Sequence, residues 1–220
     1  PRHSSSAASD VYKRQGLHFA PQSRYGRQYE RFHSWNYSDK YDEVMATYYQ
    51  QVYAVDVAVG VIRAALRSHG VEKNTVVIFT SDNGFMCGAH GYGSKVLPYE
   101  ESARVPLIMY DPRHRNSGKE LRCDTLTGNV DLMPTLLELA TVAVPEGIDG
   151  KSILPLYEDT GARIRDSLPL VNVWGPAEVF SLSVVTKRHK YIYWPWAGEG
   201  FKAAEELYLS LIHISEPTRQ

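Results

Sequence analysis

The strongest constraint on the fold is a long amphipathic segment that is followed almost at once by a short apolar run. Across residues 39–69, apolar side chains recur at intervals of three and four, at Val44, Tyr48, Val52, Val55, Val59, Ile62 and Leu66. This period predicts one helix with a continuous apolar stripe. After Gly70, which can end the helix, the β-branched run 75–80 is typical of a strand in a buried parallel sheet. Helix, short loop and strand together predict an α/β fold.

Polar side chains come directly after this strand. In the segment Ser81-Asp82-Asn83-Gly84, the side chains of Asp82 and Asn83 offer the hard oxygen ligands that Ca²⁺ and Mg²⁺ prefer. Lys95 follows one short loop later, as a compact cation that can bind an anionic group. Ligands of open α/β sheets bind beyond the carboxyl ends of the strands, so we expect a site here. Asp, Asn and Gly also suit an ordinary turn, which is the structural alternative.

A series of short motifs runs in a fixed order through the chain. They are Val55-Asp56, residues 74–84, Gly88-Ala89-His90-Gly91, Ser94-Lys95, Tyr99-Glu100-Glu101-Ser102, residues 104–108, residues 129–137, Asp149-Gly150-Lys151-Ser152 and Glu205-Glu206-Leu207-Tyr208. This order resembles the C-terminal half of the sulfatase family, within the alkaline phosphatase superfamily. So many ordered motifs outweigh the interpretation of residues 81–84 as a turn alone.

The resemblance implies a fold, a cofactor and roles for single residues. The expected fold is α/β and alkaline phosphatase-like, with helices around a mostly parallel sheet and a smaller antiparallel sheet towards the C-terminus. Asp82 and Asn83 match the family's second pair of ligands to a divalent cation, Ca²⁺ or Mg²⁺. Lys95 matches the lysine that contacts the sulfate group. The implied partner is a sulfated small molecule or glycan, and family frequency favours a carbohydrate sulfate.

Histidines are candidates for the remaining roles in such a site. Sulfatases place a histidine near the leaving group, upstream of the long helix, and His18 is the best-placed candidate, with His33 as a rival. His90 lies five positions before Lys95 in a glycine-flanked loop. It either lines the substrate pocket or braces its loop through a ring hydrogen bond, and the sequence leaves both roles open.

The resemblance also implies a nucleophile that this chain does not supply. In sulfatases a Cys or Ser in a C-x-P-S-R type motif is matured to formylglycine, whose hydrate attacks the ester. Neither Cys87 nor Cys123 begins such a motif. We therefore expect the nucleophile and the family's other metal ligands in an absent N-terminal half. We expect the chain by itself to bind metal weakly and to be inactive.

The two ends of the chain differ in character from the rest. Residues 10–15 can be encoded by DNA whose reverse complement translates to Leu-Ser-Leu-Ile-His-Ile, which is the sequence of residues 209–214. The head and the tail thus resemble translated sequencing adapters, and we exclude them from fold reasoning. The expected organisation is a scar at 1–15, the C-terminal part of the α/β domain with its metal loop at 16–147, an antiparallel subdomain at 148–208 and a second scar at 209–220.

Several further elements follow from local patterns. Residues 105–110 form a second strand candidate, and Asp131 is placed to cap a helix that starts just after it. Glu100 and Glu101 are expected to make structural contacts with Arg104. Towards the C-terminus, β-forming residues cluster between turns and predict antiparallel strands at 167–173, 179–186 and 191–194.

Composition excludes several other classes of protein. The formal net charge of −1 gives no basic stripe for nucleic acid. No apolar run reaches the roughly 18 residues of a membrane span. Two cysteines are too few for a disulfide framework. Secretion or a periplasmic location is expected from the family resemblance alone, and the oligomeric state stays open.

Two other functions compete with the sulfatase interpretation. The first is a phosphodiesterase or phosphonate hydrolase of the same superfamily, in which Asp-His-Gly commonly stands where this chain has Asp82-Asn83-Gly84. The second is an inactive, sulfatase-like binding domain. A nucleophile motif upstream would separate these alternatives.

Overall fold

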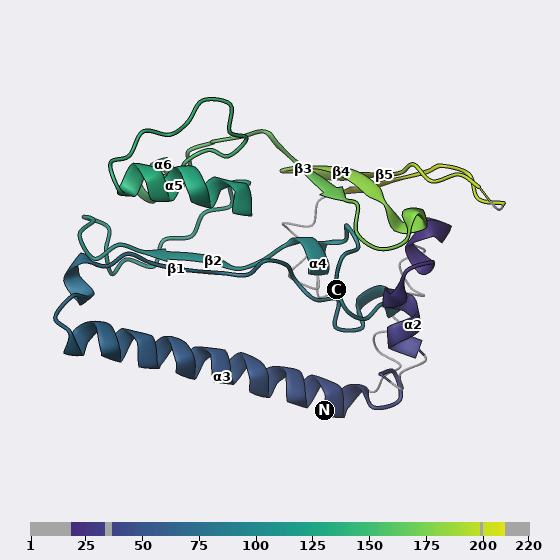
Figure 1. Cartoon of the computed structure of the whole chain (residues 1–220), viewed down its shortest axis with the longest axis horizontal. Coiled ribbons are helices and arrows are strands. Elements are labelled where there is room, and N and C mark those ends of the chain that lie inside the picture. Colours follow the sequence, from purple (N-terminus) through teal and green to yellow (C-terminus); the bar gives the residue numbers. More distant parts are fainter. Residues whose placement is uncertain (1–18, 34–36, 199, 210–220) are drawn as a thin grey trace, which may run out of the picture. The chain divides into compact units, whose positions relative to one another are not determined.

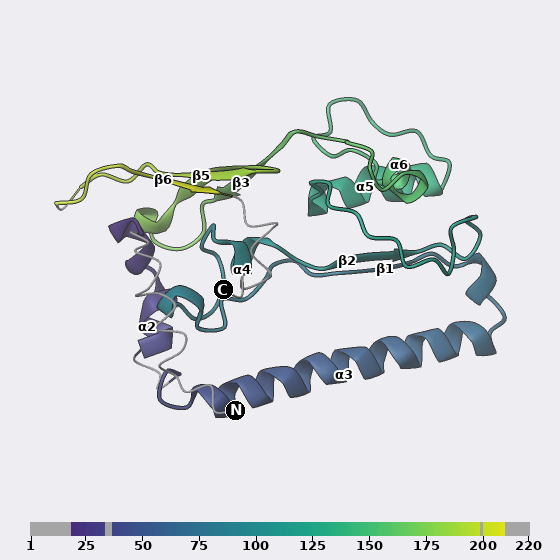
Figure 2. The same ribbon diagram turned by 180° about the vertical axis from the view of Figure 1, so that it is seen from behind.

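A computed structural model of the chain describes residues 19–33, 37–198 and 200–209 (Figures 1 and 2). The adapter-like segments 1–15 and 209–220 lie outside these residues, apart from Leu209. The chain divides into two compact units that alternate along the sequence. Unit 1 combines Pro1–Ser117, Asn172–Phe180 and Trp196–Ala203, and unit 2 combines Gly118–Val171, Ser181–Pro195 and Ala204–Gln220. The boundary expected at residue 148 lies inside unit 2.

Unit 1 is built from one long helix, several short helical turns and a pair of strands. The long helix α3 spans Tyr41–Ser68, within two residues of the predicted bounds at each end. Its C-cap is His69, and Gly70 follows in the left-handed conformation, with a φ of 68°. The short elements are η1 (Pro21–Arg24), α2 (Arg27–His33), η2 (Glu72–Asn74), η3 (Ala89–Gly91), α4 (Glu100–Ala103) and η5 (Ala177–Val179).

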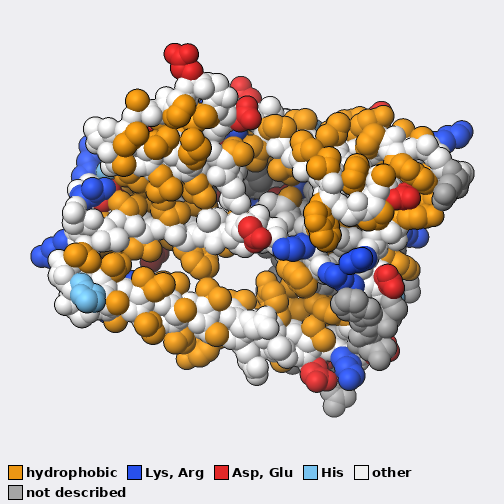
Figure 3. All heavy atoms as spheres, in the orientation of Figure 1, with side chains coloured by type: hydrophobic (Ala, Val, Ile, Leu, Met, Phe, Trp, Pro, Cys, Tyr) orange, Lys and Arg blue, Asp and Glu red, His pale blue; other side chains and the backbone are white. Residues whose placement is uncertain are grey.

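The apolar stripe of α3 is present, but the described residues cover it only in part. No residue of α3 is buried, and the side chains of Val52, Val55 and Ile62 are exposed. Figure 3 shows hydrophobic side chains at the surface along this helix. Its N-terminal part does make contacts, because the hydroxyl of Tyr41 donates to the backbone oxygen of Cys87 at 3.0 Å. The period of the stripe therefore predicted the helix. The described residues, however, fully bury no side chain of its apolar face. None of the helices in these residues is long and apolar enough to cross a membrane.

The two strands of unit 1 run antiparallel. Strand β1 (Val77–Thr80) pairs with β2 (Leu107–Tyr110), with Val77 opposite Tyr110 and Thr80 opposite Leu107. We expected the first strand to lie in a mostly parallel sheet, whereas its described partner, β2, runs antiparallel to it. A parallel neighbour needs a crossover connection, usually a helix. Residues 81–106 contain no long helix, and they return the chain beside the strand it has just left.

The core of unit 1 lies in this irregular connection. We call residues 81–104 the site loop. Met86, Tyr92, Leu97 and Tyr99 of the site loop are buried. The ring of Phe19 contacts Tyr92 and Tyr99, with centroids 6.0 and 4.9 Å away in edge-to-face geometry. An irregular segment is thus the best-packed part of the unit.

Unit 2 contains a four-stranded sheet and two helices. The strand order is β3 (Ser167–Asn172), β4 (Ser181–Thr186), β5 (His189–Trp194) and β6 (Ala204–Leu209). The pairs β4–β5 and β5–β6 are antiparallel, which confirms the predicted antiparallel region. Side chains alternate, so that Ile192 and Trp194 are buried while Leu182 and Leu207 are exposed. The helices are α5 (Leu132–Leu139) and α6 (Leu154–Glu158).

Asp131 anchors the helical part of unit 2. Its side chain makes no capping hydrogen bond to α5, contrary to our expectation. The carboxylate is buried instead, and it accepts hydrogen bonds from the backbone nitrogens of Gly128 and Lys151, both at 2.8 Å, and from the guanidinium of Arg165. A carboxylate that leaves water needs such partners, because an unpaired buried charge is costly.

Candidate anion and metal site

The polar segment after β1 forms a tight turn. The Ser81 hydroxyl donates to the backbone oxygen of Asn83 at 2.8 Å, and the Asn83 backbone nitrogen donates to Asp82 Oδ1 at 2.8 Å. The Asn83 side-chain amide donates to the backbone oxygen of Gly84 at 2.8 Å. The turn expected as the structural alternative therefore exists. It leaves the Asp82 side chain 81% exposed, so turn geometry and ligand binding are compatible here.

Gly84 fixes this turn against α4. Its backbone nitrogen donates to the backbone oxygen of Ser102 at 2.8 Å. A Cβ at position 84 would lie 2.1 Å from the backbone oxygen of Glu101, a separation that real side chains do not tolerate. Only glycine lets the two backbones approach so closely. This close approach places Asp82 and Asn83 at the edge of the site loop.

Lys95 reaches the same place from the other side of the site loop. Its Nζ donates to Asn83 Oδ1 at 2.8 Å and lies 3.8 Å from Asp82 Oδ2. The Lys95 side chain is 46% exposed. The structure thus brings three predicted site residues into one cluster, which pairs a cation with two oxygen-bearing side chains at a solvent-accessible surface.

His90 braces the site loop. Its Nε2 lies 3.0 Å from Glu101 Oε1, and its ring lies 5.1 Å from the ring of Phe19 and 5.8 Å from that of Tyr99. The contact with Glu101 is a brace within the site loop, and a role of His90 in substrate binding stays a prediction. The expected contact of Glu101 with Arg104 also stays a prediction.

The donor set fits part of a divalent cation's coordination shell. Asp82 and Asn83 offer carboxylate and amide oxygens, which are the ligands that Ca²⁺ and Mg²⁺ prefer. Ca²⁺ takes about six to eight oxygens, so two side chains supply a minority of them. Among the described residues, no group of three or more His, Cys, Asp and Glu side chains could hold a metal ion. Other ligands have to complete a cation site here.

Of the two histidines that are candidates for the leaving-group role, the structure describes only His33. His18 lies outside the described residues. His33 ends α2, where its ring lies 4.3 Å from that of Tyr29. A Cβ on Gly91 would lie 3.7 Å from His33 Nε2, so this imidazole is close to the backbone beside His90. His33 therefore neighbours the site loop, while its contacts are with rings of its own helix.

Cys87 lies on the site loop among three tyrosines. Burial raises the pKa of the Cys87 thiol, and a hydrogen bond with Tyr48 partly opposes this shift. Burial and then the neighbouring Cys87 raise the pKa of Tyr37 to about 12, and the same two causes raise the pKa of Tyr41. A buried thiol with a raised pKa is a poor nucleophile. Cys87 is therefore suited to packing against the start of α3.

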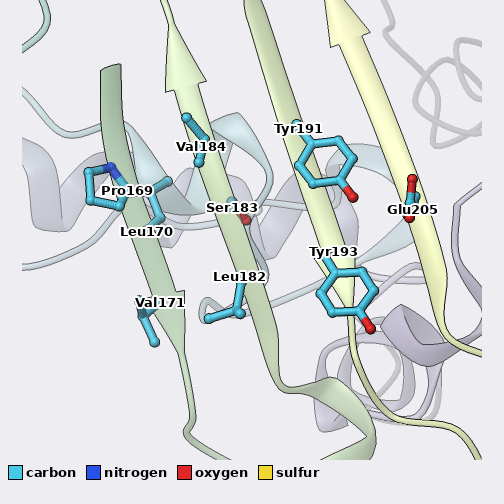
Figure 4. Close-up of a pocket in the computed structure, with 9 residues that line it drawn as sticks. All are labelled: Pro169, Leu170, Val171, Leu182, Ser183, Val184, Tyr191, Tyr193 and Glu205. Carbon is cyan, nitrogen blue, oxygen red and sulfur yellow. The ribbon is translucent and has the colours of Figure 1, made fainter. Parts of the chain in front are cut away.

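Unit 2 carries a separate pocket that no sequence argument indicated. It has a volume of about 500 Å³ and lies on the exposed face of the sheet (Figure 4). Burial and then the Glu205 carboxylate raise the pKa of Tyr191, one of its lining residues. The lining includes no cationic side chain, which is unfavourable for an anionic ligand. The residues that line it are Pro169, Leu170, Val171, Leu182, Ser183, Val184, Tyr191, Tyr193 and Glu205.

Sequence reasoning missed the residues that hold the site loop in place. Gln28 and Arg31 of α2 donate hydrogen bonds to Lys95 and Ser94, and Ser102 accepts one from the Val96 backbone nitrogen. Gln28 and Lys95 are 67 positions apart in sequence, so no local spacing could have revealed this contact.

Comparisons with known proteins identify relatives of this chain. Residues 14–142 match the sulfatase family, and residues 88–198 match the C-terminal region of N-sulphoglucosamine sulphohydrolase. An arylsulfatase of Clostridium perfringens is 35% identical over 155 residues, which are 70% of this chain and 32% of that protein. An N-acetylglucosamine-6-O-sulfatase of Bacteroides thetaiotaomicron is 38% identical over 127 residues, 58% of this chain and 22% of that protein. The chain thus spans about a third or less of the length of these relatives.

Solved structures show the same fold. One, described as a complex with its substrate D-glucosamine-2-N,6-O-disulfate, has a TM-score of 0.66 and 31% identity over 78% of this chain and 35% of its own. A phosphonate monoester hydrolase of Agrobacterium radiobacter has a TM-score of 0.67 and 25% identity over 78% of this chain and 36% of its own. The predicted alkaline phosphatase-like α/β class is confirmed. Since the family match covers more than half of the chain, this protein belongs to the sulfatase family.

Proposed function

We propose that this chain is part of a metal-dependent sulfatase that hydrolyses sulfate esters, with carbohydrate sulfates as its substrates. The observation that carries the proposal is the cluster in the site loop. There Lys95 Nζ lies 2.8 Å from Asn83 Oδ1 and 3.8 Å from Asp82 Oδ2. The Lys95 ammonium group is held beside two side chains that can bind a metal ion. This arrangement suits the recognition of a sulfate group that contacts the lysine and the metal ion together.

Each of these side chains has a distinct role in the proposal. Lys95 binds a peripheral or bridging oxygen of the sulfate group and stabilises the charge that develops there in the transition state. Asp82 and Asn83 hold the cation, while His90 and Glu101 keep the loop in shape. When bound, the Ca²⁺ or Mg²⁺ ion polarises the sulfate and favours ionisation of the formylglycine hydrate that we expect from an upstream part of the protein.

Relatives support the choice of a carbohydrate substrate. The name of one relative specifies N-acetylglucosamine-6-O-sulfate esters, and a solved structure contains a sulfated glucosamine. Transferred to this chain, these two names support a sulfated glycan, while the arylsulfatase of Clostridium perfringens supports an aryl sulfate as a test substrate. Secretion or a periplasmic location is consistent with such a substrate and stays a prediction from the family.

Phosphonate or phosphodiester hydrolysis is the competing activity. It is favoured by the structural likeness to a phosphonate monoester hydrolase, which is as strong in TM-score as the likeness to sulfatases. The sequence Asp82-Asn83-Gly84 weighs against it, because these hydrolases commonly have histidine at the second position. An inactive binding domain is the third candidate, and a nucleophile motif in the complete gene would exclude it.

The decisive experiment uses the complete gene from the source DNA, recovered with primers inside residues 16–208. The complete protein is assayed on an aryl sulfate and on the matching aryl phosphate, beside a Lys95→Ala variant. We expect an upstream C-x-P-S-R type motif, a preference for sulfate and a fall in kcat/KM of about a hundredfold or more in Lys95→Ala. A preference for phosphate, or a complete gene without such a motif, would contradict the proposal.

A further inference from the structure

We infer that helix α2 positions the sulfate-binding lysine and that Gln28 is the main positioning residue. This inference rests on the proposed function for the role of Lys95, but its structural basis is separate. Gln28 does not reach the cluster of Asp82, Asn83 and Lys95 side chains. It acts on the backbone from which the Lys95 side chain extends.

Three hydrogen bonds connect α2 to consecutive residues of the site loop. The Gln28 side-chain amide donates to the backbone oxygen of Lys95 at 2.7 Å. The Gly93 backbone nitrogen donates to the backbone oxygen of Gln28 at 2.8 Å. Arg31 NH1 donates to the Ser94 hydroxyl at 2.8 Å. One helix therefore holds residues 93, 94 and 95 through both backbone and side chains.

The contact is partly buried, although the Lys95 side chain itself is half exposed. Gln28 is 5% exposed, and Ser94 is also buried. A hydrogen bond shielded from water is stronger than an exposed one, and its loss leaves a carbonyl without a partner. The Gln28 amide is thus suited to hold a backbone that carries a solvent-accessible side chain.

The backbone on both sides of Lys95 needs such support. Ser94 has a φ of 67° and Val96 a φ of 92°, both in the left-handed region that non-glycine residues avoid. Such conformations are strained and persist only where the surroundings enforce them. The Met86 backbone nitrogen donates to Ser94 at 2.7 Å, and Val96 donates to the Ser102 hydroxyl at 2.8 Å. Between these two residues, the Gln28 side-chain amide donates to the backbone oxygen of Lys95 itself.

Without the Gln28 bond, we expect the backbone at Lys95 to relax towards ordinary dihedral angles. The long lysine side chain would then spend less time beside Asn83 and Asp82. An amine that donates to Asn83 Oδ1 is less available to an acylating reagent than a free one. The accessibility of the Lys95 amine therefore reports its position without any assay of turnover.

The first test is acylation of the complete protein with a trace amount of N-hydroxysuccinimidyl acetate. Mass spectrometry measures acetylation of Lys95 relative to Lys73, a lysine of η2 that is separated from the site loop by strand β1. In Gln28→Leu, which keeps the volume but removes the amide, we expect the ratio of Lys95 to Lys73 acetylation to rise about fivefold.

Gln22 provides the matched control. It is also buried, and its side-chain amide donates to the backbone oxygens of Trp196 at 3.1 Å and Lys202 at 2.7 Å, with no contact to the site loop among its recorded bonds. Gln22→Leu removes a comparable amide from the same unit, so we expect it to leave the ratio unchanged. If both variants raise the ratio equally, the effect is general loosening and the inference is overturned.

Arg31→Met provides a second variant should Gln28→Leu fail to fold. It removes the donor to Ser94 while keeping an apolar stem of similar length. We expect the acetylation ratio to rise in this variant too, by a smaller factor than in Gln28→Leu, because the bond reaches Lys95 through its neighbour. An unchanged ratio in every folded α2 variant would overturn the inference.

A double-mutant cycle connects position with turnover. If Gln28 acts through Lys95, Gln28→Leu lowers kcat/KM for an aryl sulfate about tenfold in the native protein and has no further effect in the Lys95→Ala background. Equal losses in both backgrounds would show that Gln28 acts elsewhere and would overturn the inference. If the acetylation ratio shifts in a protein without sulfatase activity, positioning stands and the proposed function fails.

Discussion

The long helix α3 and the site loop are opposites in regularity and in burial. Helix α3 has 28 residues of regular backbone and buries none of them. The site loop contains only short turns, yet it holds four of the best-buried side chains of unit 1, those of Met86, Tyr92, Leu97 and Tyr99. The regular helix is thus poorly buried, whereas the irregular loop that follows it in sequence is well packed.

This contrast shows where the precision of the candidate site originates. A helix satisfies its backbone groups by itself, whatever surrounds it. An irregular loop lacks this repeating pattern, and the backbone groups of the site loop find partners in α2 and in non-repeating bonds within the loop itself, such as that between Gly84 and Ser102. The position of Lys95 is therefore a property of tertiary contacts.

The largest expected effect is that of a methyl group added to the site loop. In Gly84→Ala the new Cβ would lie 2.1 Å from the backbone oxygen of Glu101 and 3.0 Å from that of Arg104. The backbone has to move apart, so we expect the free energy of unfolding to fall by about 3 kcal/mol. Urea denaturation of the complete protein followed by tryptophan fluorescence would measure this. An unchanged midpoint would mean that the loop yields easily, and the contrast with α3 would disappear.

An intermediate effect is expected for the reactivity of the two cysteines. Cys87 is partly buried at the site loop, whereas Cys123 is exposed in unit 2. Because burial raises the pKa of Cys87, a smaller fraction is thiolate at pH 8, and we expect iodoacetamide to modify it about tenfold more slowly than Cys123. The Cys87 rate should keep rising above pH 9, as its thiol ionises. Equal rates at pH 8, measured by peptide mass spectrometry, would show that the loop opens readily.

The smallest expected effect is the same substitution placed in α3. A Cβ at Gly60 would meet no atom within 4 Å. Alanine favours the helix over glycine by about 0.5–1 kcal/mol, so Gly60→Ala is expected to raise stability slightly. The change in urea midpoint serves as the matched control for Gly84→Ala. A loss of stability at residue 60 would indicate that this face of α3 packs tightly against another part of the complete protein.

Local sequence patterns predicted the regular elements well. The three- and four-residue period across residues 39–69 gave α3 to within two residues, and alternating β-formers gave strands β3 to β5. The order of motifs indicated the family, and the segment after β1 indicated Asp82, Asn83 and Lys95 as neighbours. Their roles in metal and sulfate binding stay predictions.

Other features could not be obtained in this way. The pairing of β1 with β2 is antiparallel because the chain turns back without a crossover helix. The apolar residues 75–80 do not indicate in which direction the chain continues after them. His90 pairs with Glu101 across the site loop, and no sequence pattern indicated this pair. Asp131 was assigned as a helix cap from its position before α5, but its carboxylate bonds Arg165 and the backbone nitrogens of Gly128 and the distant Lys151.

The sequence by itself determined which segments are helical or extended and which side chains are candidates for the chemistry. Both depend on the preferences of neighbouring residues, and these are local. The tertiary structure decided which faces are buried and where Lys95 points. The Gln28 bond to Lys95 joins residues 67 positions apart, and it forms only after the intervening chain has folded back. Closing such a loop has an entropic cost that many contacts offset together, so no single residue pattern reveals it.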